Sequence, residues 1–126
     1  MSYFLLIVDD NLSLANLYQI VFERDDWRVQ RVSGGQEALD SIAAELPDVI
    51  LLDVMMPDMD GIEVCRRIRD ERPAPPPYIV VYTANNRPEV RESSLAAGAD
   101  MFFSKNLPVF ELPGRVLAHL QQSAEQ

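Results

Sequence analysis

Short apolar runs alternate with segments of helical periodicity along the whole chain. The runs are YFLLIV, WRVQRV, DVILLD, YIVVYT and MFFS, at residues 3–8, 27–32, 48–53, 78–83 and 101–104. Three of them are almost continuously apolar, which is typical of strands buried on both faces of a parallel sheet. The pattern therefore predicts five strands in one parallel sheet.

The segments between these runs place apolar residues three and four positions apart, so that each helix has one apolar face. This spacing occurs within residues 14–22, 39–46 and 62–68. Pro88 and Gly98 suit the first turn and the end of a fourth helix. Five successive strand–helix units predict an α/β fold with right-handed crossovers and helices on both faces of the sheet.

Polar residues at the starts of the predicted helices are expected to cap them. Asn11 and Ser33 precede the first two helices and are predicted N-caps. Asp58 and Asp60 lie in the MPDMDG loop, and we expect them to shape this loop and to cap the third helix.

Two stretches depart from the regular alternation. The proline-dense segment RPAPPPYI, residues 72–79, is expected to be a stiff surface loop, with a polyproline ligand for a partner domain as the alternative. In the last helix, Pro113-Gly114 falls where an interior turn would be. Either the helix begins near Pro113, or it starts at Pro108 and is kinked or broken there, because proline interrupts a helix interior. We favour a distorted first half followed by a regular stretch over about residues 115–121.

Composition points to one globular domain. The chain has 126 residues, of which 48% are hydrophobic and 25% are charged. We assign residues 1–122 to the domain and residues 123–126 to a polar tail. The 20 acidic residues exceed the 11 basic ones, giving a net charge of −9, which argues against direct nucleic-acid binding.

The sequence also indicates the cellular compartment in which the protein is expected to function. The single cysteine, Cys65, cannot form an internal disulfide and is expected to pack in the core. No apolar run approaches the roughly 20 residues of a membrane helix, and the N-terminus lacks signal-peptide features. We therefore expect a cytoplasmic protein without a membrane partner.

Three carboxylates follow two of the predicted strands. Asp9 and Asp10 end the first strand, and Asp53 ends the third. In open parallel sheets, ligands bind beyond the carboxyl ends of the strands, so these groups meet if the two strands are neighbours. Their mutual repulsion would be relieved by a hard divalent cation with oxygen ligands. The pattern predicts a site for Mg²⁺, or for Mn²⁺ in its place.

Two further polar residues belong to the same edge of the predicted sheet. Thr83 ends the fourth strand, and Lys105 follows the fifth. A hydroxyl and an ammonium directed at a magnesium-bound carboxylate suit a phosphoryl group. One aspartate would attack phosphorus, and the product would be an aspartyl phosphate.

These residues stand in motifs that resemble the receiver domain of two-component response regulators. The motifs are VDDN (8–11), DVILLDVMMPDMDGIE (48–63), YTA (82–84) and AAGADMFFSK (96–105), in matching order and spacing. The resemblance covers essentially the whole chain. It implies a flavodoxin-like, doubly wound fold with strand order 2-1-3-4-5, as in the chemotaxis member of the family.

The resemblance also implies roles for the acidic residues. Asp53 would accept a phosphoryl group from a sensor histidine kinase or a phosphotransfer protein. Asp10 and Asp53 would bind Mg²⁺ directly, together with the backbone carbonyl of Met55, whereas Asp9 would act through a bound water. The chain would catalyse only its own phosphorylation and dephosphorylation, and would not be an enzyme otherwise.

The remaining roles concern the phosphoryl oxygens and the switch. Thr83 and Lys105 would contact the phosphoryl oxygens, and Phe102 occupies the family's aromatic switch position. Phosphorylation would draw Thr83 inward and let Phe102 turn into the space it leaves. The surface of the fourth helix, fifth strand and fifth helix would then change.

Output and assembly remain open at this stage. The chain would act on a downstream protein target by itself, or through a C-terminal output domain of a longer regulator. A homodimer through the fourth helix, fifth strand and fifth helix is a further expectation. Asp100 and Arg115 lie where some DNA-binding members form dimer salt bridges, although Met101 lacks the usual second acidic residue.

One departure and two alternatives bear on this interpretation. Lys105 is followed by Asn106 instead of the family's proline, whose peptide bond is cis. A cis bond without proline costs roughly 2.5–4 kcal/mol, so the geometry at 105–106 stays open. The alternatives are a degenerate receiver that binds partners without phosphorylation, and a magnesium-dependent aspartyl-phosphate phosphatase, which would need a cap or substrate pocket.

Overall fold

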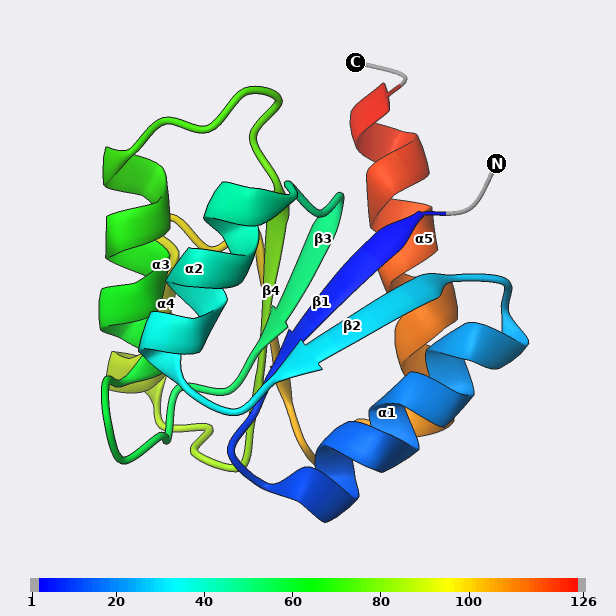
Figure 1. Ribbon diagram of the computed structural model, residues 1–126. Helices are drawn as coiled ribbons and strands as arrows, with labels where there is room; N and C mark the ends of the chain where they lie inside the picture. The colour runs from blue at the N-terminus through cyan, green and yellow to red at the C-terminus, as the bar shows by residue number, and fades with distance from the viewer. Residues whose placement is uncertain (1–2, 125–126) are drawn as a thin grey trace.

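The computed structural model describes residues 3–124 and contains one parallel sheet between two layers of helices (Figure 1). The strand order is β2-β1-β3-β4-β5, and every neighbouring pair is parallel, which confirms the predicted fold class and order. The elements are β1 (Phe4–Val8), α1 (Leu12–Arg24), β2 (Arg28–Val32), α2 (Gly35–Ala44), β3 (Val49–Leu52), α3 (Gly61–Asp70), β4 (Tyr78–Thr83), α4 (Pro88–Ala96), β5 (Met101–Ser104), the 3-10 turn η1 (Val109–Glu111) and α5 (Leu112–Ala124).

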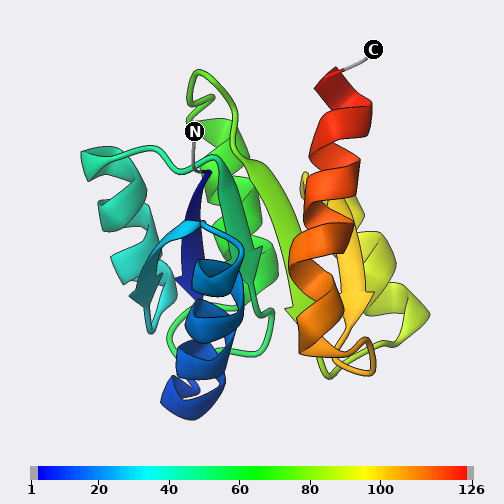
Figure 2. The same ribbon diagram turned by 90° about the vertical axis from the view of Figure 1, so that its right-hand side faces the viewer.

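The helices cover both faces of the sheet, as predicted. Helices α1 and α5 lie on one face, and α2, α3 and α4 lie on the other (Figures 1 and 2). Successive strand residues point to opposite faces, so β1 contributes Leu6 and Val8 to one hydrophobic core and Leu5 and Ile7 to the other. Cys65 of α3 is fully buried in the first core, as expected.

The predicted helix starts are confirmed at three places and wrong at one. Asn11 caps α1 by accepting from the backbone N–H of Leu14, Asp60 caps α3 in the same way, and Pro88 begins α4. Ser33, however, is not the N-cap of α2, because that helix begins one residue later, behind Gly34.

Asp58 supplies the missing cap of α2 from a distant part of the sequence. Its carboxylate, in the loop before α3, accepts from the backbone N–H groups of Gly35 and Gln36 at 3.0 and 3.4 Å. The hydrogen bond from Gly35 is the main reason why the pKa of Asp58 lies below its usual value. The loop that follows β3 is therefore attached to the start of α2.

The last helix begins next to Pro113, one of the two starts left open by the sequence, and its regular part begins earlier than the favoured residue 115. A 3-10 turn over Val109–Glu111 leads directly into α5, so that Pro113 falls in the first turn of the helix. A proline is tolerated there because the N–H it lacks would have no helical partner. Helix α5 continues to Ala124, and residues 125 and 126 of the predicted tail lie outside the described residues.

Among residues 3–124, no helix is both long enough and apolar enough to cross a membrane. The carboxyl ends of the strands point to the end of the molecule opposite the start of β1 and the end of α5 (Figure 1). The proline-dense segment forms the connection between α3 and β4 and is largely exposed over residues 74–76.

Candidate functional site

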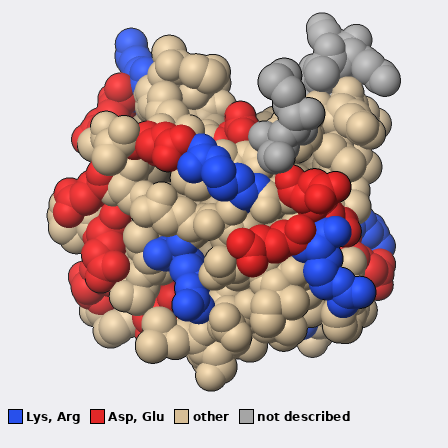
Figure 3. Space-filling view, turned by 45° about the vertical axis from the view of Figure 1, so that its right-hand side comes forward, with Lys and Arg blue, Asp and Glu red and all other residues tan. Residues whose placement is uncertain are grey.

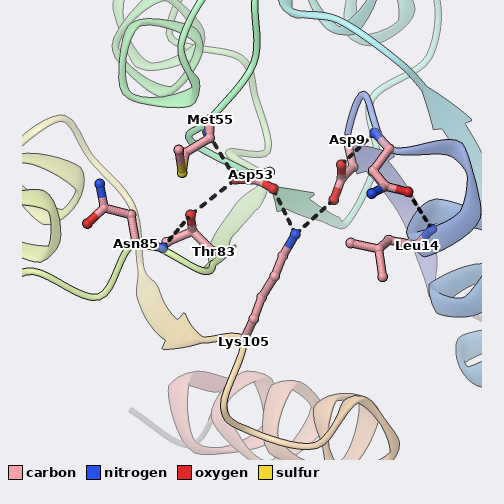
Figure 4. A network of polar contacts seen from close by, with 8 residues as sticks. Asp9, Leu14, Asp53, Met55, Thr83, Asn85 and Lys105 are labelled. Carbon is pink, nitrogen blue, oxygen red and sulfur yellow. Dashed lines mark hydrogen bonds and ion pairs between the residues drawn. The ribbon is translucent and has the colours of Figure 1, made fainter.

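Four of the predicted site residues meet where the parallel strands end (Figure 4). Asp9 follows β1, Asp53 follows β3, Thr83 is the last residue of β4, and Lys105 follows β5. They come together because parallel pairing puts the carboxyl ends of these strands at one edge of the sheet.

Asp53 is buried, with 8% of its surface exposed, and both of its carboxylate oxygens are bound. Oδ1 accepts from the backbone N–H of Met55 at 2.9 Å and from the hydroxyl of Thr83 at 3.1 Å. Oδ2 accepts from the ammonium of Lys105 at 2.8 Å. The carboxylate is thus held in one orientation by three donors.

Asp9 is buried more deeply, with 3% of its surface exposed. Oδ1 accepts from the backbone N–H of Asn11 at 2.9 Å, and Oδ2 lies 3.4 Å from the ammonium of Lys105. Burial raises the pKa of Asp9, and the charge of Asp53 adds to this rise, while Asn11 and Lys105 oppose it. The ionised form of Asp9 is therefore costly, and further positive charge would stabilise it.

Lys105 is the only lysine of the chain, and its side chain rises between Asp9 and Asp53 (Figure 4). Burial by itself lowers the pKa of Lys105. The hydrogen bond to Asp53 and the charges of Asp53 and Asp9 outweigh this and raise the pKa above its usual value. The Lys105–Asn106 bond is trans. Lys105 therefore reaches both carboxylates without the cis geometry associated with the family's proline.

The predicted metal ligands are only partly gathered. Asp10 is exposed beside buried Asp9, and residues 3–124 include no group of three acidic, histidine or cysteine side chains arranged to hold a metal ion. The carboxylates of Asp9 and Asp53 do fit a hard cation, because they offer oxygen donors and Asp9 needs more positive charge. Direct ligation by Asp10 and by the carbonyl of Met55 remains a prediction.

The two predicted switch residues differ in burial. Thr83 is fully buried, and its hydroxyl already contacts Asp53. Phe102 is half-buried against the core beneath α3 and α4, and the guanidinium of Arg91 lies 5.8 Å from the centre of its ring. Their roles in switching remain predictions.

Two supporting residues escaped the sequence analysis. A Cβ on Gly61, at the start of α3, would lie 2.4 Å from the carbonyl oxygen of Asp53, so only glycine allows this close approach. Tyr82 donates from its hydroxyl to the carbonyl of Leu107, in the turn that carries Lys105. No sequence signal distinguishes Tyr82, because Tyr78 and Thr83 of the same strand also carry hydroxyls.

Comparison with known proteins identifies the family. The family model described as the response regulator receiver domain matches residues 5–117. The chain belongs to this family. Receiver domains are the phosphorylation-activated switches of two-component signalling.

Individual relatives agree with this assignment. The alkaline phosphatase synthesis transcriptional regulatory protein PhoP of Bacillus subtilis is 39% identical over 119 residues, which cover 94% of this chain and 49% of PhoP. The response regulator MprA of Mycobacterium bovis is 37% identical over 123 residues, covering 98% of this chain and 53% of MprA. This receiver domain thus spans about half the length of the curated relatives it matches.

A solved structure supports the fold. The BeF3-activated receiver domain of DrrB, a Thermotoga maritima protein, has a TM-score of 0.85 and 28% sequence identity to this chain. The similarity covers 96% of this receiver domain and 99% of the DrrB domain.

Proposed function

We propose that Asp53 is the phosphoacceptor of this receiver domain and that a sensor histidine kinase or a phosphotransfer protein supplies the phosphoryl group. A carboxylate oxygen of Asp53 forms a bond to phosphorus while the bond from phosphorus to the donor nitrogen breaks. The carrying observation is that Thr83 and Lys105 both donate to the Asp53 carboxylate, at 3.1 and 2.8 Å. The same donors can stabilise the phosphoryl oxygens as charge develops on them.

A divalent cation belongs to this proposal. Asp9, Asp10, Asp53 and the carbonyl of Met55 would hold Mg²⁺, with Asp9 acting through water. When bound, the cation neutralises the phosphoryl oxygens. The raised pKa of Asp9 supports this role, because a buried carboxylate gains most from added positive charge.

A protein donor suits the surroundings of the site better than a small molecule. Leu12 and Met55, three and two residues after Asp9 and Asp53, are apolar and more than half exposed. Apolar side chains beside a charged site favour contact with a protein surface. These exposed apolar side chains favour a signalling switch over a phosphatase.

The output surface in this proposal consists of α4, β5 and α5. Ser94 is the only buried residue of α4, whereas α1 and α3 each bury four. An element with little buried surface can change its arrangement at low cost. Such a loosely packed helix, next to half-buried Phe102, supports a shift of this surface when Asp53 is phosphorylated.

We also propose which domain or protein receives the signal and how two copies of the chain associate. The relatives are about twice as long, so we propose that the domain of residues 1–122 and the tail of 123–126 act with a C-terminal output domain or a separate target protein in the cytoplasm. In the single chain, Arg115 pairs with Glu111 and Asp100 pairs with Arg69. In a homodimer through α4, β5 and α5, Arg115 and Asp100 would exchange these partners for residues of the second copy. Sedimentation of the phosphorylated protein tests the dimer.

The test of Asp53 is intact mass after incubation with Mg²⁺ and acetyl phosphate. We expect one phosphoryl addition on the wild type and none on Asp53→Asn. Asp58→Asn is the matched control, since Asp58 is an exposed carboxylate of the loop that follows Asp53, and this variant should still be modified. Equal modification of wild type and Asp53→Asn would refute the assignment. Continuous phosphate release without accumulation of modified protein would favour the phosphatase.

A further inference from the structure

The turn that carries Lys105 is attached to the neighbouring strand by the hydroxyl of a buried tyrosine. Tyr82, in β4, has 4% of its surface exposed. Its hydroxyl donates to the backbone carbonyl of Leu107 at 2.6 Å, within the range of O–H···O hydrogen bonds. Leu107 lies two residues after Lys105, so this contact acts on the far side of the turn.

The remaining bonds of the turn show why this contact matters. The N–H of Leu107 donates to the carbonyl of Ser104 at 2.9 Å, closing a β-turn with Lys105 at its second position. The N–H of Asn106 donates to the hydroxyl of Ser104 at 3.1 Å. Both bonds join residues within the turn, so neither fixes the position of the turn relative to Asp53.

Two consecutive residues of β4 set this direction. The carbonyl of Thr83 accepts from the N–H of Lys105 at 2.8 Å, which holds the near side of the turn. The hydroxyl of Tyr82 holds the far side. The backbone of Lys105 is therefore fixed from both sides to the strand that also presents the Thr83 hydroxyl to Asp53.

The ring of Tyr82 is itself held in place. Tyr18 of α1 packs against it edge-on, with ring centres 5.5 Å apart, and the ammonium of Lys105 lies 5.9 Å from the centre of the Tyr18 ring. Burial raises the pKa of Tyr82, partly offset by the charge of Lys105. The hydroxyl therefore keeps its proton and remains a donor at physiological pH.

We propose that Tyr82 is a positioning residue for phosphoryl transfer, whose hydroxyl fixes the turn at Ser104–Leu107 so that Lys105 meets the phosphoryl group on Asp53. This inference rests on the proposed function, in which Lys105 contacts the phosphoryl oxygens. The lysine side chain is long and flexible, so the position of its ammonium group depends on a fixed backbone. Small displacements of a reacting group lower rates strongly.

A double-mutant cycle separates positioning from a general effect on stability. The rate of phosphorylation by acetyl phosphate with Mg²⁺ is measured for wild type, Tyr82→Phe, Lys105→Met and the double variant. We expect Tyr82→Phe to slow the reaction about three- to tenfold, as for loss of one hydrogen bond. In the Lys105→Met background, Tyr82→Phe should have no further effect, because Tyr82 acts only through Lys105. An equal loss in both backgrounds would overturn the proposal.

The single lysine provides a direct spectroscopic measurement. With ¹⁵N-labelled lysine, the side-chain ammonium gives one signal, which slow proton exchange should make visible in the wild type. We expect Tyr82→Phe to broaden or shift this signal. The control is Tyr78→Phe, which removes the hydroxyl that contacts His119 at the other end of β4. An unchanged ammonium signal in Tyr82→Phe would contradict positioning.

The two proposals fail in different ways. If Asp53→Asn is phosphorylated like the wild type, the proposed function is wrong. If Asp53→Asn is inactive while Tyr82→Phe reacts at the wild-type rate, only the role of Tyr82 is wrong.

Discussion

At the scale of single residues, the site consists of two buried carboxylates, Asp9 and Asp53, on either side of the Lys105 ammonium. Lys105 bonds to Asp53 at 2.8 Å and lies 3.4 Å from Asp9. Burial makes the charged form of Asp9 unfavourable, and the pKa of Asp9 is raised as a result. A site that holds such a group in place for its chemistry gives up stability for function.

Replacing Asp9 should therefore stabilise the folded protein. We expect Asp9→Asn to raise the free energy of unfolding by about 1 kcal/mol at pH 7. The pKa of Asp9 is raised in the folded state. The free-energy cost of burying its charge is therefore absent below the usual pKa of 3.8, where the carboxyl group is protonated, and is complete only above the folded-state pKa. Urea titrations from pH 3 to pH 7 should show the gain appearing as pH rises.

The neighbouring residue provides the control for this prediction. Asp10 is exposed, so Asp10→Asn should change stability little at pH 7. A stability of Asp9→Asn equal to or below that of the wild type at pH 7 would contradict this account of the site.

At the scale of elements, one arginine joins the end of α3 to two loops. Arg69 donates from Nε to the carbonyl of Gly98, from Nη1 to the carbonyl of Pro77, and from Nη2 to Asp100. Gly98 has φ +115 and ends α4, where Gly98 and Ala99 donate back into the last turn. The otherwise loosely packed α4 is thus anchored at its C-terminal end through Arg69.

Loss of this arginine should be costly in spite of its partial exposure. We expect Arg69→Met to lower the free energy of unfolding by about 2 kcal/mol, because carbonyl groups of both loops lose a charged donor. Arg67→Met is the matched control, since Arg67 is exposed and only pairs with Glu63 on the same helix. Urea unfolding of the two variants compares them, and equal losses would argue against the anchor.

At the scale of the whole molecule, the site occupies one end of the sheet, and the start of β1 and the end of α5 lie at the other (Figure 1). On the face shown in Figure 3, basic side chains lie singly among acidic and uncharged ones. With a net charge of −9, this distribution suits contacts with proteins better than with nucleic acids.

Activation should be visible in α4. With Mg²⁺ and beryllofluoride, we expect amide hydrogen exchange to change in α4 and β5, and to stay constant in α1 and α3, which are more deeply buried. Asp53→Asn under the same conditions is the control and should show no change. Identical exchange in α4 of the wild type before and after addition would contradict the proposed output surface.

The local pattern of residues determined much of this protein. Periodicity located the five strands and the first three helices, with β4 and β5 at the predicted bounds, because apolar spacing follows directly from strand and helix geometry. Pro88 and Gly98 marked the ends of the fourth helix. The positions of Asp9, Asp53, Thr83 and Lys105 at strand ends could be read in the same way. Motif order then identified the family, whose model matches residues 5–117.

Only the tertiary structure decided how distant residues support this site. Asp58 caps a helix that begins 23 residues earlier, and Tyr82 bonds to a carbonyl 25 residues later. Such contacts depend on which chain segments lie side by side, and a sequence pattern describes only neighbours along one element. For the same reason, the exposure of Asp10 and the bridging of two carboxylates by Lys105 became visible only in the folded chain.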